Sequence, residues 1–168
     1  MSQIIELSTT LGAADILKAS LAKLTVLNPT MAVWIEQLDS QPLIVECVQK
    51  AVTLVAANGV KSSDRIANFF GNEQTSHQGQ AIIAALKTDR LPNGLGIMID
   101  GQGQIRFAAD DYKSEWKQEI NRLKNLFQNA FLAVASQTIL EIVGYETTIA
   151  AAADNHGLTT YTVKGVSV

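Results

Sequence analysis

Apolar residues in the N-terminal third of the chain recur at helical spacing, and short polar breaks separate the repeats. Residues 4–8 are an apolar run that predicts a strand, and the stripe over 13–24 predicts a helix. Two further stripes lie within 28–59, and each begins at a polar residue and a proline, which suit the first turn of a helix. Residues 28–59 therefore predict a helical hairpin, which Asn58 and Gly59 close in a left-handed cap.

The middle of the chain alternates between apolar runs and glycine-containing turns. Residues 81–86 are a six-residue apolar run, and their length and neighbours favour a strand over a helix. The runs 95–100 and 104–109 are separated by a turn with two glycines, which predicts a β-hairpin. We expect residues 81–86 to pair with residues 95–100. Residues 65–71 are compatible with a short capped helix or with an extended segment.

The strongest helical pattern runs from Ser114 to Val143, a length of about 45 Å at 1.5 Å per residue. Residues 130–140 are apolar nearly all round and need a cover, for which the predicted hairpin over 28–59 is the best candidate. Gly144 ends this helix, and the last twenty or so residues predict a closing hairpin that turns at 154–157. The buried stripe is expected to consist of Trp116, Ile120, Leu123, Phe127, Ala130 and Val134.

These elements predict a single α+β domain over residues 1–168. Its core is an antiparallel sheet of about five or six strands packed on the one long helix, with an inserted helical hairpin at 28–59. The strand over 158–166 is expected to end the sheet and to leave an unpaired edge.

A series of short motifs follows one another in a specific order along the chain. They are Phe70-Gly71-Asn72 with Thr75, Gly94 to Ile97 before Asp100-Gly101, Ala108 to Asp111, Ile142 to Tyr145, and Asn155-His156-Gly157. In this order the chain resembles the hypothetical chloroplast reading-frame family thirty-five, which comprises small uncharacterised proteins and also occurs in cyanobacteria and some phages. The resemblance covers roughly residues 3–25 and 64–166, and residues 28–59 have no counterpart in it. It implies an α+β fold without an established activity.

The amino-acid composition argues against a disordered chain and against non-specific binding of nucleic acids. Hydrophobic residues make up 47% of the chain and charged residues 17%, so the chain is neither disordered nor highly charged. The 21 Asn and Gln outnumber the 16 Asp and Glu, so amides supply much of the polar surface. The net charge of −3 argues against the basic stripe that non-specific nucleic-acid binding requires.

The cysteine count and the longest apolar runs indicate the cellular compartment in which the protein is expected. Cys47 is the single cysteine, which excludes an internal disulfide and a cysteine-based zinc site and favours a reducing compartment. No apolar run approaches the roughly 20 residues of a membrane span. We therefore expect a soluble cytoplasmic protein without a cofactor or a metal.

Two adjacent carboxylates are the strongest candidate for chemistry. Asp110 and Asp111 follow a predicted strand, where they could present oxygens to a magnesium ion or act as acid and base, which makes a weak metal-dependent enzyme one alternative function. The preferred interpretation is capping, because Asp111 or Ser114 fits the N-cap of the following helix. His77 and His156 lie in predicted loops without companion metal ligands.

A second alternative is a winged-helix DNA-binding regulator. Residues 48–55, 63–71 and 75–86 can be written as three helices, with a wing at 95–109. The acidic net charge and the scarcity of Lys and Arg in the third helix count against this alternative. That helix would present Thr75, Ser76, His77, Gln78 and Gln80 to bases, with Lys61, Arg65, Lys87, Arg90 and Arg106 near phosphates.

The favoured hypothesis is a non-catalytic protein-interaction or assembly module that binds another protein or a second copy of itself. Its basis is an amide-rich surface without a converging set of titratable residues, together with the threonine-rich edge near the C-terminus. The candidate interaction residues are Thr159, Thr160, Thr162, Asn72, Gln74 and His77.

Overall fold

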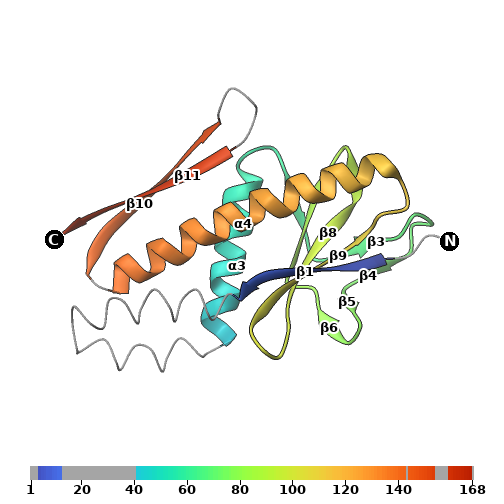
Figure 1. Ribbon diagram of the computed structural model, residues 1–168, viewed down its shortest axis with the longest axis horizontal. Coiled ribbons are helices and arrows are strands. Elements are labelled where there is room, and N and C mark those ends of the chain that lie inside the picture. Colours follow the sequence, from blue (N-terminus) through green and yellow to red (C-terminus); the bar gives the residue numbers. More distant parts are fainter. Residues whose placement is uncertain (1–3, 13–40, 143, 154–158, 168) are drawn as a thin grey trace.

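A five-stranded antiparallel sheet and a long helix organise the chain, and a two-stranded ribbon lies apart from the sheet (Figure 1). The structure, a computed structural model, describes residues 4–12, 41–142, 144–153 and 159–167. The sheet has the order β1-β9-β8-β7-β2. Its strands are β1 (Ile4–Gly12), β2 (Lys61–Ser63), β7 (Ala84–Thr88), β8 (Leu91–Ile99) and β9 (Gln104–Asp110).

The remaining elements of the described residues are two helices and three hairpins. The helices are α3 (Gln41–Ala56) and α4 (Ser114–Ile142). The hairpins are β3 (Ile66–Ala67) with β4 (Glu73–Gln74), β5 (Ser76–His77) with β6 (Gln80–Ala81), and β10 (Tyr145–Ala153) with β11 (Thr159–Ser167). The predicted α+β class and the long helix are confirmed. Neither helix combines the length and the apolar composition that crossing a membrane requires.

The two faces of the sheet carry two separate cores. Because side chains alternate along a strand, Ile97 and Phe107 point to the face covered by α3 and α4, where the main core lies. Met98 and Ala108 point to the opposite face, where they form a smaller core with residues of the segment that contains β3 to β6. Gly96 suits this close packing, because a Cβ at this position would lie 3.2 Å from Cγ2 of Ile66.

The apolar stripe of α4 is buried as predicted, and α3 crosses it. Ile44, Val48 and Val55 of α3 pack into the main core together with Phe127 and Val134 of α4. Thus α3 supplies part of the cover that the apolar C-terminal half of α4 needs. The helix stops at Gly144, whose φ of +94° and whose N–H bond to the carbonyl of Glu141 form the expected left-handed cap.

Two predictions about the arrangement of elements need correction. The described residues show no inserted helical hairpin, because α3 is a single helix and residues 13–40 lie outside the described part. The C-terminal strand does not end the main sheet. Instead, among the described strands β10 and β11 pair only with each other, and their inner residues cover α4.

The strand predicted over 81–86 is confirmed in part. Ala84, Ala85 and Leu86 belong to β7 and pair with β8, whereas Ala81 belongs to β6 and residues 82–83 lie between the two strands. Residues 63–86 consist of turns and short strands from the end of β2 to β7, and contain no helix. The winged-helix arrangement is therefore wrong, since its recognition helix does not exist. The segment is extended and not helical because β7 buries aliphatic side chains on both of its faces.

Glu119 ties α4 to the turn between β7 and β8. Its side chain is only 4% exposed and accepts hydrogen bonds from Arg122 Nη2 at 2.7 Å, Arg122 Nε at 3.0 Å and Thr88 Oγ1 at 2.9 Å. The N–H of Leu91 donates to Thr88 Oγ1 at 3.1 Å, which extends this series of hydrogen bonds to the first residue of β8. The hydrogen bonds from Arg122 hold the pKa of Glu119 below its usual value, against the opposing effect of burial.

We expect Phe127→Ala to lower the free energy of unfolding by about 3–5 kcal/mol, because it would open a cavity in the main core. The Phe127 ring is fully buried and lies 5.8 Å from the Phe107 ring and 6.1 Å from the Phe131 ring, centre to centre. Urea denaturation measures the change. Gln118→Ala is the control, because Gln118 is exposed on the same helix. A loss below about 1 kcal/mol for Phe127→Ala would contradict the assigned core.

We expect the Glu119→Gln variant to lose less stability than the wild type as the pH falls from 6 to 3. Because the folded-state pKa of Glu119 is lowered, its contribution is present above the unfolded-state pKa and disappears as the pH falls through the folded-state value. Urea titrations at several pH values measure this slope. The control, Glu115→Gln, changes an exposed carboxylate of the same helix and should keep the wild-type slope. Equal slopes for Glu119→Gln and the wild type would contradict the prediction.

Candidate functional site

Most residues of the C-terminal ribbon are exposed. In it β10 and β11 pair antiparallel over nine residue pairs, from Tyr145 with Ser167 to Ala153 with Thr159. It lies along the C-terminal half of α4 (Figure 1). Ile149 and Tyr161 pack against the main core, whereas Thr160 on the opposite face is exposed.

Both edges of this ribbon lack a further strand within the part of the chain that the structure describes. Natural proteins usually protect such edges with charges, prolines or bulges. Here the regular register has no bulge, and the two strands contain only Glu146 and Lys164 as charged residues. The predicted uncharged edge at Thr159, Thr160 and Thr162 therefore exists, although it belongs to the ribbon and not to the main sheet.

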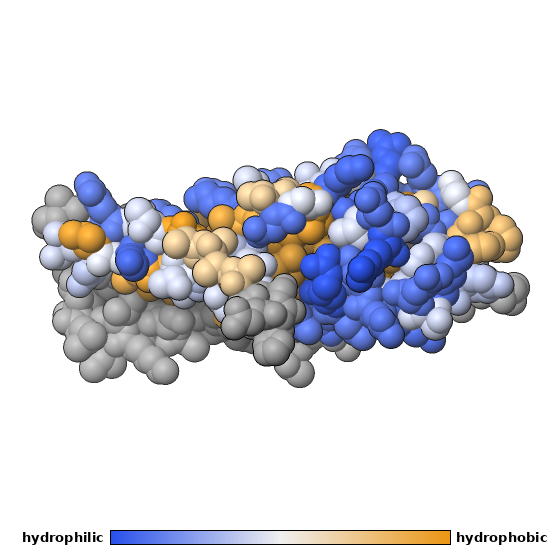
Figure 2. Space-filling model, turned by 90° about the horizontal axis from the view of Figure 1, so that it is seen from above, coloured by the Kyte–Doolittle hydropathy of each residue, from blue (hydrophilic) through white to orange (hydrophobic). Residues whose placement is uncertain are grey.

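A groove follows the boundary between β11 and α4. It has a volume of about 520 Å³, and its helix side includes Leu132 and Leu140, of which Leu132 is 40% exposed. Its strand side includes Thr160, Tyr161 and Val163. Hydrophobic residues are gathered in the half of the molecule that carries the ribbon, whereas the other half of this face is mostly hydrophilic (Figure 2). The edge of β11 thus borders an apolar groove.

Two contacts fix the ribbon on the rest of the molecule. The Tyr161 hydroxyl accepts a hydrogen bond from Asn58 Nδ2 at 3.1 Å, and burial raises the pKa of Tyr161. Gly165 permits close approach to the helix, because a Cβ there would lie 3.3 Å from Leu140 Cδ1 and 3.3 Å from Tyr145 Cδ1. The edge of β11 is therefore held in position over α4.

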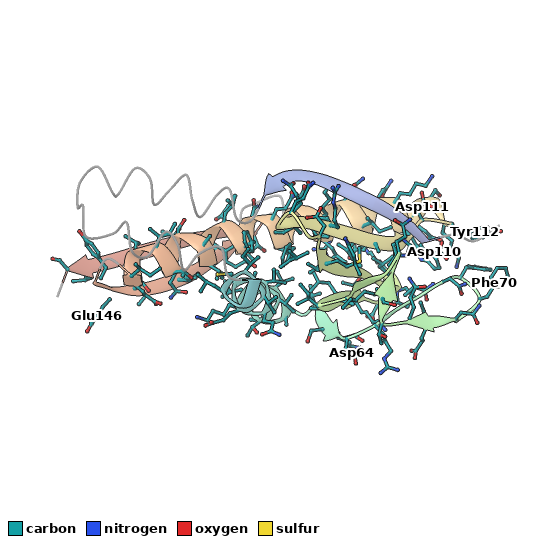
Figure 3. The ribbon with its side chains drawn as sticks, turned by 90° about the horizontal axis from the view of Figure 1, so that it is seen from below. Asp64, Phe70, Asp110, Asp111, Tyr112 and Glu146 are labelled. Atoms are coloured by element: carbon teal, nitrogen blue, oxygen red, sulfur yellow. The ribbon has the colours of Figure 1, made fainter. Side chains whose placement is uncertain are left out.

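The other predicted interaction residues are not brought together with the threonines. Asn72 belongs to a turn in which its N–H donates to Asn68 Oδ1 at 3.0 Å. Gln74 Nε2 and His77 Nδ1 are 3.2 Å apart. Figure 3 shows residues of the neighbouring loops, among them Phe70, at one end of the molecule and Glu146 of β10 at the other. The six predicted residues thus form two groups and not one site.

Asp110 holds two loops together at the end distant from the ribbon. Its carboxylate is fully buried and accepts hydrogen bonds from the N–H of Phe69 at 2.6 Å and from the N–H of Tyr112 at 2.9 Å. Asp111 instead forms an ion pair with Lys117 in the first turns of α4, at 3.7 Å. The described residues contain no group of three or more His, Cys, Asp or Glu that could hold a metal ion.

The loops that Asp110 holds present an exposed aromatic cluster, which the sequence pattern did not reveal. Phe69 lies 4.6 Å from the Tyr112 ring and 5.6 Å from the Phe70 ring, and Phe70 is 71% exposed. The ammonium group of Lys113 lies 5.6 Å from the centre of the Phe69 ring. A sequence signal existed only in the aromatic pair itself, which is isolated in a polar segment.

Cys47 offers no nucleophile. It is buried in α3, and burial raises the pKa of its thiol, so that the reactive thiolate is disfavoured. Its Sγ lies 3.6 Å from Thr138 Oγ1 of α4. Cys47 thus behaves as a small apolar residue at the contact between α3 and α4.

Comparison of the chain with protein-family models, with curated proteins and with solved structures finds no match. The resemblance to the hypothetical chloroplast reading-frame family thirty-five therefore stays a prediction.

We expect Asp110→Ala to lower the free energy of unfolding by about 1–3 kcal/mol for each N–H group that it leaves without a partner. Urea denaturation measures the loss, and amide exchange should accelerate at Phe69 and Tyr112. Asp111→Ala is the matched control, because it removes only a long ion pair to an exposed lysine and should cost at most about 1 kcal/mol. Equal losses for the two variants would contradict the role of Asp110.

Proposed function

We propose that this protein is a non-catalytic assembly module, and that its partner is a second copy of itself bound through the edge of β11. The observation that carries the proposal is the regular edge of β11, in which Lys164 is the one charged residue, beside the apolar groove on α4. An added strand would satisfy the outward N–H and C=O groups of β11 and cover exposed apolar surface at the same time. Addition of one strand would thus satisfy the edge of β11 and cover the groove together.

A second copy fits this edge because antiparallel pairing of β11 with itself is closed by a two-fold axis. An axis perpendicular to the ribbon preserves its faces, so outward threonines of one copy meet outward threonines of the other. In a register centred on Tyr161, Thr160 of each copy lies opposite Thr162 of the other. The two Lys164 side chains are then far apart, and no like charges oppose each other.

The helices add to the same interface. Pairing around this axis produces a continuous four-stranded sheet with both copies of α4 on one face. The groove residues Leu132, Leu140 and Val163 of each copy then lie next to the joint. Apolar burial beside the backbone hydrogen bonds supplies the free energy that an isolated edge contact lacks.

We expect wild-type protein to dimerise and Thr160→Lys/Thr162→Lys to be a folded monomer, because the register places a lysine of one copy opposite a lysine of the other. Light scattering coupled to size-exclusion chromatography measures the mass. The control Asn121→Lys/Asn125→Lys adds the same charge to the exposed face of α4 away from the ribbon and should remain dimeric.

A third variant tests the register. Thr160→Lys/Thr162→Glu places lysine opposite glutamate at both positions of a pair centred on Tyr161, so it should dimerise again. A monomeric wild type at high micromolar concentration would overturn the proposal. A dimer that all four proteins form equally would show that association uses another surface.

A further inference from the structure

A polar groove lies on the part of the molecule that the proposed assembly does not use. Its walls come from the start of β2, the turn between β7 and β8, and the N-terminal half of α4, and its volume is about 490 Å³. Strongly hydrophilic residues predominate on this half of the surface (Figure 2). The residues that matter here are Lys61, Lys87, Thr88, Arg90, Glu119 and Arg122.

Positive charge is concentrated in this groove although the chain as a whole is acidic. Four of the 13 Lys and Arg residues line it, whereas Asp89 and Glu119 are its only carboxylates among the lining residues. The groove therefore carries an excess of two positive charges in a protein of net charge −3. Three of the four cations are residues that the discarded winged-helix arrangement had placed near phosphates.

Two of these cations oppose each other directly. Lys61 of β2 and Lys87 of β7 are register partners in an antiparallel pair, an arrangement in which like charges destabilise the sheet. Within the described residues Lys61, Lys87 and Arg90 form no close ion pair, whereas Arg65 pairs with Asp64 and Glu73. Lys87 and Arg90 act on carboxylates only at longer range, where they help to lower the pKa of Asp64 and of Glu119, respectively. The repulsion between the two lysines would be relieved by an anion bound between them.

Arg122 gives the groove a fixed donor. Its Nε and Nη2 are held by the buried carboxylate of Glu119 at 3.0 Å and 2.7 Å, so the guanidinium is oriented before any ligand arrives. Nη1 takes no part in this pair. An oriented guanidinium loses less conformational entropy on binding an oxyanion than a mobile side chain would.

We propose that this groove binds a phosphoryl group. Cationic donors reach it from β2, from the β7–β8 turn and from α4, and the several acceptor oxygens of a phosphate can meet donors from all three directions. The volume is within the range of small-molecule sites. The same chemistry is presented by a phosphorylated small molecule and by a phosphorylated side chain of another protein.

Isothermal titration of the full chain with inorganic pyrophosphate tests the proposal, and a phosphoserine peptide with neutral flanking residues is titrated in parallel. We expect saturable binding of at least one of the two probes, and the stronger probe identifies the source. Lys61→Gln/Arg90→Gln should weaken this binding at least about tenfold, since each lost charge-assisted hydrogen bond accounts for about that factor. Arg122 is left intact because Glu119 depends on it.

The matched control is Lys50→Gln/Lys117→Gln, which removes the same charge from exposed positions outside this groove and should leave the affinity within about twofold. Absence of saturable binding to both probes would overturn the proposal. The proposal is also overturned if both double variants lose the same affinity, or if succinate binds as tightly as the phosphate probes. It is overturned as well if a DNA duplex binds tightly and Lys61→Gln/Arg90→Gln leaves that binding unchanged. Circular dichroism of every variant confirms that it is folded.

Discussion

The apolar stripe of α4 is the constraint on which the rest of the structure depends. Its N-terminal half packs against the main sheet, and its C-terminal half extends beyond that sheet, where α3 and the ribbon cover it. An apolar stripe that runs along a whole helix has to be covered along that whole length. The ribbon exists as a separate element because the sheet alone does not reach the far half of the helix.

The two halves of α4 also carry the two proposed binding surfaces separately. The ribbon and its groove lie on the C-terminal half of α4, where the strands hold few charges. The phosphoryl groove lies at the N-terminal half, where Glu119 and Arg122 join the helix to the turn before β8. Asn58 lines the phosphoryl groove and also donates a hydrogen bond to Tyr161 of the ribbon, so one side chain touches both regions.

The sequence predicted those elements that depend on local pattern. The stripe of α4, the hairpin of β8 and β9 and the glycine cap at Gly144 all follow from spacing and turn chemistry, and all three are present. The detachment of the ribbon could not be predicted, because it depends on which surface needs a cover and not on the strands themselves. The role of Asp110 as a clamp between loops, and the meeting of Lys61 with Lys87, depend on long-range register that spacing does not contain.

Amide hydrogen exchange in β11 as a function of protein concentration tests the central claim most directly. Residues whose N–H groups point away from β10 face solvent in the monomer and become hydrogen-bonded when a second β11 is added. We predict that protection of every second amide in β11 rises with concentration, while the amides of α4 and of the main sheet stay unchanged. Exchange in β11 that is independent of concentration, in a sample that light scattering shows to be dimeric, would contradict the account.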